Sequence, residues 1–245
     1  MRRFGLIGYP LSHSFSQSYF SEKFKRENIS DAIYENFPIN SISSLQTVLK
    51  NNLDLIGLNV TIPYKFSIIE HLDKASTKLP VNACNCIRIN AGTLTGYNTD
   101  IIGFEQSLLS QLKPYHTTAL ILGDGGAAKA VKFVLDKLGI SFSVVTRRMD
   151  DPGLLHYHDL TKERIENSLL IVNTTPLGMY PNVEAAPDIP YQYLGDRHYL
   201  YDLIYNPPQT MFLKKGEAQG ATTKNGHEML ILQAEESWRI WNNPL

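Results

Sequence analysis

The amino-acid sequence predicts an α/β protein made of two domains. Strand-like and helix-like segments alternate in both halves of the chain, which is typical of α/β folds. A glycine-rich turn at 123–126 interrupts the second series of segments. The length of 245 residues lies in the range where chains begin to divide into more than one domain. We place the junction near residues 97–101.

In the first half, short apolar runs that end at glycine or proline predict strands. Apolar residues three or four apart predict helices, as at Tyr19, Phe20 and Phe24. A turn at 90–92 predicts one antiparallel hairpin. The predicted strands are 3–8, 32–39, 55–62, 84–89 and 93–97, and the predicted helices are 16–28 and 41–51.

The second half repeats this alternation. A helix is predicted after Asn98 and ends near Leu112, before a Lys-Pro pair. The tail is predicted to be helical because apolar residues recur there at spacings of three and four. The predicted strands are 118–122, 142–146, 169–173 and 199–204, and the further predicted helices are 126–138 and 227–241.

Composition excludes several classes of protein. Lys and Arg total 23 and Asp and Glu total 24, so no basic excess favours nucleic acid or an anionic membrane surface. No apolar run approaches the ~20 residues of a membrane span. The two cysteines, Cys84 and Cys86, are too few for a zinc site and are expected to be reduced. We expect a cytoplasmic protein without metal, membrane or nucleic-acid partners.

The glycine-rich turn predicts a nucleotide site. Gly123, Gly125, Gly126 and Ala127 are small, so backbone N–H groups can approach a pyrophosphate at the start of the next helix. A tight structural turn is the alternative. The order of strand, turn and helix favours the nucleotide.

The residues after the following strand predict that the nucleotide is NADP. NAD-binding domains carry an acidic residue about 20 positions after the glycines. Here Thr146 is followed by Arg147 and Arg148. Guanidinium groups bind a 2′-phosphate bidentately, although a basic pair in a loop can also be merely solvated. The position favours NADP.

Two serines near the N-terminus are candidates for binding a carboxylate. Ser14 and Ser16 follow a Gly-Tyr-Pro turn, and in an extended segment their hydroxyl groups would point the same way. Taken alone, the motif is more typical of an N-cap for the helix that follows.

Further polar residues gather where predicted strands end. Asn59, Thr61 and Lys65 surround the proline that ends one strand, Asn85 lies in the next, and Asp100 begins a helix. An aspartate at a helix start is usually a cap. A lysine and an aspartate beside a nicotinamide can also serve hydride transfer, with the lysine moving a proton and the aspartate orienting it.

Taken together, these segments resemble the shikimate dehydrogenase family from one end of the chain to the other. The resemblance implies a substrate-binding domain at 1–99 plus 227–245, a Rossmann-like NADP-binding domain at 100–226, and a cleft between them. The matching segments are GYPLSHSFS at 8–16, NVTIPYK at 59–65, the region of Asn85, GYNTD at 96–100, GDGGAAKAV at 123–131, NTTPLGM at 173–179, YDLIYNPPQTMFL at 201–213 and MLILQA at 229–234.

The resemblance also implies a reaction, the reversible NADP-dependent reduction of 3-dehydroshikimate to shikimate in aromatic amino-acid biosynthesis. Lys65 and Asp100 match the family's catalytic pair. Ser14 and Ser16 match its carboxylate clamp. The other matches are the substrate contacts Asn59, Thr61, Asn85, Tyr205 and Gln233, and the cofactor contacts Thr174 and Met229. We expect a monomer or a homodimer.

The chain departs from the family pattern at four places. Gln17 replaces a proline after the two serines, and Glu228 replaces a glycine before Met229. The arginine pair follows Thr146 where Asn-Arg-Thr is usual. Asp124 stands in the glycine turn, where a carboxylate could repel phosphates.

Three rival functions remain. An NAD-using quinate/shikimate dehydrogenase is disfavoured by Arg147 and Arg148. A methylenetetrahydrofolate dehydrogenase is not favoured by the serine motif or by the segment 201–213. A non-catalytic NADP-binding sensor is disfavoured because Lys65 and Asp100 are both present.

Overall fold

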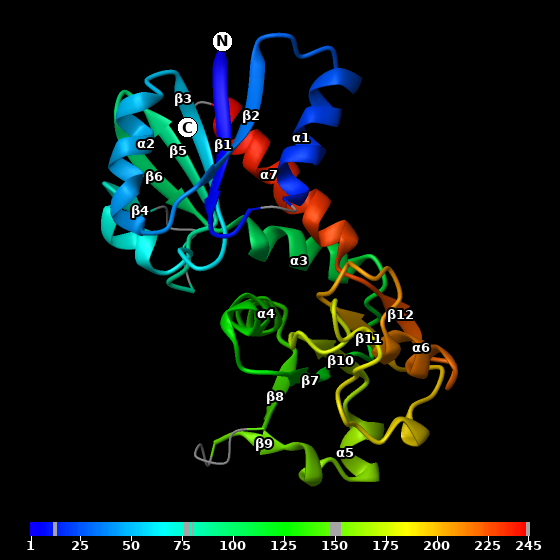
Figure 1. The fold of residues 1–245 in the computed structure, drawn as a ribbon. Helices are drawn as coiled ribbons and strands as arrows, with labels where there is room; N and C mark the ends of the chain where they lie inside the picture. The colour runs from blue at the N-terminus through cyan, green and yellow to red at the C-terminus, as the bar shows by residue number, and fades with distance from the viewer. Residues whose placement is uncertain (12–13, 76–78, 80, 148–152, 244–245) are drawn as a thin grey trace. The chain divides into compact units, whose positions relative to one another are not determined.

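The computed structural model describes residues 1–11, 14–75, 79, 81–147 and 153–243. The chain divides into two compact units, one of residues 1–99 with 234–245 and one of residues 100–233 (Figure 1). The predicted two-domain α/β class is confirmed. Residues 227–233 belong to the second compact unit. The predicted start of the substrate-binding segment at residue 227 stays a prediction.

The first unit is built on a mixed six-stranded sheet with the order β2-β1-β3-β5-β6-β4. β1 is parallel to β2 and β3, and the predicted hairpin of β5 and β6 is antiparallel. The hairpin turns at Ala91 and Gly92, which both have positive φ. The bounds are β1 Arg2–Gly8, β2 Ala32–Pro38, β3 Leu55–Val60, β4 Lys74–Ala75, β5 Cys86–Asn90 and β6 Thr93–Tyr97.

Both faces of this sheet are buried, which follows from the alternation of side chains along each strand. On β1, Phe4 packs in a cluster with α1 and α7, whereas Ile7 packs in a cluster with α2 (Figure 1). The helices are α1 Phe15–Arg26, α2 Leu45–Asn51 and α7 His227–Asn242, with 3₁₀ helices η1 Ile42–Ser44 and η2 Ser67–His71.

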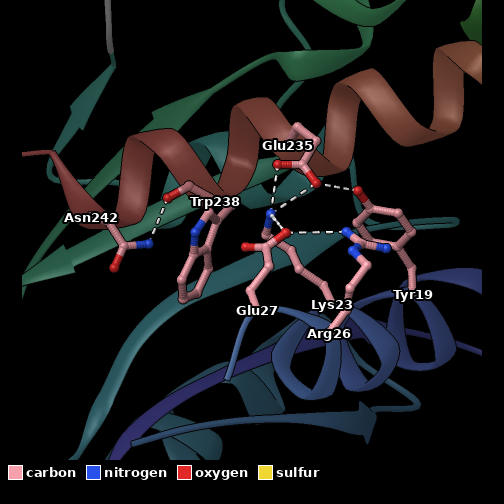
Figure 2. Close-up of polar contacts among 7 residues, drawn as sticks. All are labelled: Tyr19, Lys23, Arg26, Glu27, Glu235, Trp238 and Asn242. Atoms are coloured by element: carbon pink, nitrogen blue, oxygen red, sulfur yellow. Dashed lines mark hydrogen bonds and ion pairs between the residues drawn. The ribbon is translucent and has the colours of Figure 1, made fainter. Parts of the chain in front are cut away.

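A cluster of charged groups fastens α1 to α7 (Figure 2). Lys23 is almost fully buried, and its Nζ donates to Glu27 at 2.9 Å and to Glu235 at 2.8 Å. Tyr19 also donates its hydroxyl to Glu235. Burial and then this hydrogen bond raise the pKa of Tyr19, so the phenol remains a donor. The cluster therefore fixes the C-terminal part of α7 against α1.

The second unit is built on a parallel six-stranded sheet with the order β12-β11-β10-β7-β8-β9. Numbered from β7, this is the strand order of doubly wound dinucleotide-binding sheets. Its strand order reverses between β7 and β10, and the glycine turn follows β7. The bounds are β7 Thr118–Leu122, β8 Ser141–Thr146, β9 Leu155–His156, β10 Leu170–Asn173, β11 Tyr199–Asp202 and β12 Thr222–Lys224.

Helices cover both faces of the parallel sheet (Figure 1). Leu120 and Leu122 pack with α5 and α6 on one face. On the other, Phe104 of α3 meets the ring of Tyr201 edge to face at 5.1 Å. The helices are α3 Thr99–Leu109, α4 Gly126–Lys137, α5 Lys162–Asn167 and α6 Met211–Glu217, with 3₁₀ helices η3 Tyr157–Asp159 and η4 Tyr191–Tyr193.

Every long predicted element is present, and the differences lie at ends and in short pieces. The predicted strand 84–89 begins only at Cys86 and the predicted strand 55–62 ends at Val60, so Asn85 and Thr61 lie beside strands rather than in them. Both cysteines are buried, and they do not form a disulfide with each other. Across the described ranges, no helix is long and apolar enough to cross a membrane.

Gly57 on β3 allows α7 to pack closely against the sheet. A Cβ at Gly57 would collide with the ring of Trp241, whose Nε1 is fixed by a hydrogen bond to Ile87 O at 3.0 Å. We expect Gly57→Ala to lower the free energy of unfolding by about 1–3 kcal/mol, measured by urea titration. Gly195→Ala is the control, because a Cβ there meets no atom within 4 Å. Equal urea midpoints for the two variants would contradict the expectation.

Candidate active site

Ser14 and Ser16 stand at the beginning of α1. Ser14 is the N-cap, and its Oγ accepts the N–H of Gln17 at 3.3 Å, which is the capping role that the motif allowed. Ser16 lies in the first helical turn, as the predicted helix 16–28 implied, so the two serines do not share one extended segment. Capping uses an acceptor site of the Ser14 hydroxyl and leaves its O–H able to donate.

Gln17, which stands where the family has a proline, makes two contacts that a proline could not make. Its N–H binds Ser14, which a proline could not do because proline has no backbone N–H. Its side-chain oxygen accepts from Asn36 Nδ2 of β2 at 2.8 Å. The replacement of the family's proline therefore adds a tie between α1 and the edge strand of the sheet.

Asn59 is the centre of a buried hydrogen-bond network in the first unit. Tyr34 donates to Asn59 Oδ1 at 2.8 Å. Asn59 Nδ2 donates to Ser237 Oγ at 2.9 Å and to Asn85 O at 3.2 Å. Burial raises the pKa of Tyr34 well above its usual range, so the phenol stays protonated and donates. Asn59 thus joins β2, β3, the segment before β5 and α7.

Asn85 extends this network to the start of α3. Its Oδ1 accepts the N–H of Thr99 at 2.6 Å, and its Nδ2 donates to Thr99 Oγ1 at 2.9 Å. Thr99 Oγ1 is also 3.3 Å from Ser237 Oγ. Asn85 therefore satisfies an N–H group at the helix start, and it fixes the residue that immediately precedes Asp100.

Lys65 lies on a turn that is anchored at both ends. The N–H of Thr61 binds Ile7 O at 3.0 Å, and the N–H of Cys84 binds Lys65 O at 2.7 Å. Between them, the buried Tyr64 donates its hydroxyl to Ile39 O at 2.6 Å. The lysine side chain is half-buried. A fixed backbone thus carries the Lys65 ammonium group.

The glycine turn of the second unit connects β7 to α4. Gly123 has a φ of +102°, and a Cβ there would lie 2.9 Å from Thr174 Oγ1. Thr174 Oγ1 donates to Leu122 O at 2.8 Å, so it fixes the end of β7. The turn therefore requires glycine at 123 for both its backbone conformation and its packing.

Beyond Gly123, the turn fits a phosphate group. Gly125, Gly126 and Ala127 are exposed, and a Cβ on Gly125 would meet no atom within 4 Å. The first N–H groups of a helix have no intrahelical acceptor, and the helix dipole places positive charge there. Open space beside such donors suits an anion.

The end of β8 carries Thr146 and Arg147. Thr146 is buried and Arg147 is exposed. Burial raises the pKa of Tyr157, and the charge of Arg147 opposes that rise, which indicates that the arginine lies near η3, the 3₁₀ helix that follows β9. Arg148 lies outside the described residues. An exposed guanidinium at this strand end is suited to a ribose phosphate.

Tyr205 follows a segment fixed by the buried Asp202. The Asp202 carboxylate accepts from Thr210 Oγ1 at 2.6 Å, Asn173 Nδ2 at 3.0 Å and the N–H of Ile204 at 3.0 Å. Burial raises the pKa of Asp202 to about 6, and these donors act against the rise. Tyr205 itself is 37 % exposed.

Helices α3 and α7 approach closely in the second unit. A Cβ on Gly103 would lie 2.6 Å from Met229 O and 3.1 Å from Gln233 Cβ. Asp100 lies one turn before Gly103 on α3. It therefore lies on the side of α3 that contacts α7 at Met229 and Gln233. Glu228 does not disturb this contact, since Glu228 pairs with Lys224 and accepts from Ser107.

The predicted residues separate into two sets. The second unit holds two of the predicted substrate contacts, Tyr205 and Gln233, together with Asp100 and the predicted nucleotide-binding residues. The first unit holds Ser14, Ser16, Asn59, Thr61, Lys65 and Asn85. Ser237 and Tyr34 belong to no sequence motif, so no signal in the sequence marks them, and Thr99 is marked only as the residue before Asp100.

Comparison with known proteins agrees with this arrangement. Residues 6–87 match the family model described as the shikimate dehydrogenase substrate binding domain. The shikimate dehydrogenase (NADP(+)) of Caldicellulosiruptor saccharolyticus is 35% identical over 258 residues, covering 98% of this chain and 92% of that protein. A Thermus thermophilus shikimate 5-dehydrogenase, solved with NADP(H) and shikimate, has a TM-score of 0.85 and 30% identity, covering 100% of this chain and 95% of that one.

A third relative has another name. The quinate dehydrogenase of Corynebacterium glutamicum, solved with NAD, has a TM-score of 0.85 and 26% identity, covering 98% of this chain and 93% of that one. The fold and the glycine turn define the class of two-domain α/β proteins with a dinucleotide-binding type of sheet. Within that class, the chain belongs to the shikimate dehydrogenase family.

Ser237 tests the buried network. We expect Ser237→Ala to lower the free energy of unfolding by about 1–3 kcal/mol, because it removes the acceptor of a buried Asn59 N–H. Chemical denaturation measures the change. Ser43→Ala, at an exposed serine, is the control and should change little. A loss no larger than that of the control would show that the network is not needed for stability.

Asp202 predicts a pH dependence of stability. Its folded pKa of about 6 exceeds the reference value of 3.8, so the native chain binds more protons than the unfolded chain between these values. This contribution to stability is fully present below pH 4 and is lost as the pH rises through 6. We expect the stability of the unmodified chain relative to Asp202→Asn to fall by roughly 2 kcal/mol over this window, as measured by urea titration. A flat difference would contradict the raised pKa.

Proposed function

We propose that this chain is an NADP-dependent shikimate dehydrogenase that interconverts 3-dehydroshikimate and shikimate. The observation that carries the proposal is similarity along the whole chain to relatives of that name. Lys65 and Asp100 stand at the positions of the family's catalytic pair. In this proposal the first unit binds the substrate and the second binds NADP. The reaction belongs to aromatic amino-acid biosynthesis.

NADP would bind at the carboxyl edge of the parallel sheet. The exposed amides after Gly123 would bind the pyrophosphate, and Arg147 would bind the 2′-phosphate. When bound, NADP⁺ supplies the acceptor for a hydride from the substrate. The proposed cofactor residues are Gly123, Gly125, Gly126, Ala127, Thr146, Arg147, Arg148, Thr174 and Met229.

Substrate binding would use both charge-assisted and neutral hydrogen bonds. Ser14 and Ser16 would donate to the carboxylate, and the Ser14 hydroxyl is already oriented by the N–H that it accepts from Gln17. The ring hydroxyls would be bound by Asn59, Thr61, Lys65 and Asn85, and the further contacts would be Tyr205 and Gln233. Positioning of this kind can lower the activation barrier by ~7–11 kcal/mol.

Lys65 and Asp100 would carry out the proton transfer. Lys65 belongs to the first unit and Asp100 to the second. Lys65 would take the proton of that hydroxyl during oxidation and return it to the carbonyl oxygen during reduction. Asp100 would orient the ammonium group. The network of Asn85 and Thr99 supports this role because it fixes the backbone just before Asp100.

The nearest alternative is an NAD-using quinate/shikimate dehydrogenase. The similarity to a quinate dehydrogenase solved with NAD gives it a specific basis. The exposed Arg147 after β8, where an acidic residue would favour NAD, supports NADP instead. A non-catalytic NADP-binding sensor is the alternative from another class. Cytoplasmic location and a monomeric or homodimeric state stay predictions.

Turnover of the purified chain tests the proposal. Absorbance of the reduced nicotinamide would be followed with shikimate or quinate, each with NADP⁺ or NAD⁺. We expect the highest kcat/KM with shikimate and NADP⁺. Lys65→Ala should lower kcat about 10²–10⁴-fold, the usual contribution of a general acid-base group. Lys50→Ala, at an exposed lysine of α2, is the matched control and should keep full activity.

Three results would decide against parts of the proposal. Comparable rates with quinate and NAD⁺ would assign the broader enzyme. Full activity of Lys65→Ala would remove the proposed role of the lysine. Absence of turnover from a folded chain that binds NADPH would favour the sensor.

A further inference from the structure

The glycine turn contains a carboxylate at a place where the proposed function requires a phosphate to bind. Asp124 lies between Gly123 and Gly125, directly before the exposed amides that begin α4. Its side chain is 22% exposed, so water screens its charge only partly. A carboxylate beside a pyrophosphate repels it, and an isolated one would oppose the attraction of the helix N-terminus.

Lys132 of α4 compensates this charge. Its Nζ lies 2.5 Å from Asp124 Oδ1, and the lysine side chain is 29% exposed. Side chains on a helix lean toward its N-terminus, which allows Lys132 to reach back to the turn. Because both groups are partly buried, their interaction is stronger than that of a typical surface ion pair. The turn therefore carries one negative and one positive group, with no net charge from the pair.

We propose that the Asp124–Lys132 ion pair sets the affinity of the glycine turn for the dinucleotide pyrophosphate, with Lys132 as a positioning residue for that site. Asp124 weakens binding by repulsion, and Lys132 cancels that repulsion by neutralising the carboxylate. This inference rests on the proposed nucleotide site and adds residues to it. It does not involve Lys65, Asp100 or the substrate.

We expect the two single variants to change the Kd for NADPH in opposite directions. Lys132→Ala leaves the Asp124 carboxylate without the ammonium group, so the Kd for NADPH should rise about 5-fold. Asp124→Asn keeps the shape of the side chain and removes its charge, so the Kd should fall by a similar factor, about 5-fold. In the double variant both charges are gone, and the Kd should return to within about 2-fold of the unmodified value.

The experiment measures NADPH binding to the full chain without substrate, by the change in nicotinamide fluorescence at low salt. Lys137→Ala is the control: Lys137 lies at the other end of α4, pairs with Glu105, and should leave the Kd unchanged. Raising the salt concentration should shrink both shifts, because ions screen charges that remain partly exposed. Thermal unfolding of each variant checks that it is folded.

The results separate this inference from the proposed function. NADPH binding in which the two single variants shift in the same direction, or shift no more than Lys137→Ala, overturns the role of the ion pair and leaves the nucleotide site intact. No NADPH binding by the folded, unmodified chain overturns both. If Lys132→Ala does not fold, Asp124→Asn and the double variant still test the sign of the effect.

Discussion

The buried hydrogen bonds of Asn59 are the constraint on which the first unit depends. Its amide joins two strands, the segment before β5 and the C-terminal helix, and none of these is adjacent to the others in sequence. A buried amide must find partners, because leaving one of its groups unpaired costs the full desolvation of that group. Satisfying Asn59 therefore fixes the positions of Asn85 and Ser237, which in turn fix Thr99 at the start of α3.

The second unit solves a different problem, the placement of loops at the carboxyl edge of a parallel sheet. Thr174 binds the end of β7, and Asp202 binds Asn173 at the end of β10 and the loop that follows β11. Both side chains sit at strand ends, where the backbone groups of the loops need partners. The exposed residues of the proposed site, Gly125 and Tyr205 among them, thus stand on segments that buried polar groups hold.

Two departures from the family pattern, Gln17 and Glu228, are each accommodated by a local partner. Gln17 provides the N–H that Ser14 accepts and binds Asn36. Glu228, on the first turn of α7, pairs with Lys224 at the end of β12. Substitutions at a site thus change the bonding around it while the backbone that positions the site is preserved.

Sequence alone determined the α/β class, the long elements, the hairpin turn and the glycine turn, because each follows from local periodicity or backbone conformation. It also located the candidates Lys65 and Asp100 through motifs. Only the tertiary structure decided that Ser237 bonds Asn59, 178 residues away in sequence. Such contacts leave no trace in spacing, because their partners are chosen by the packing of whole elements and by the cost of burying an unpaired polar group.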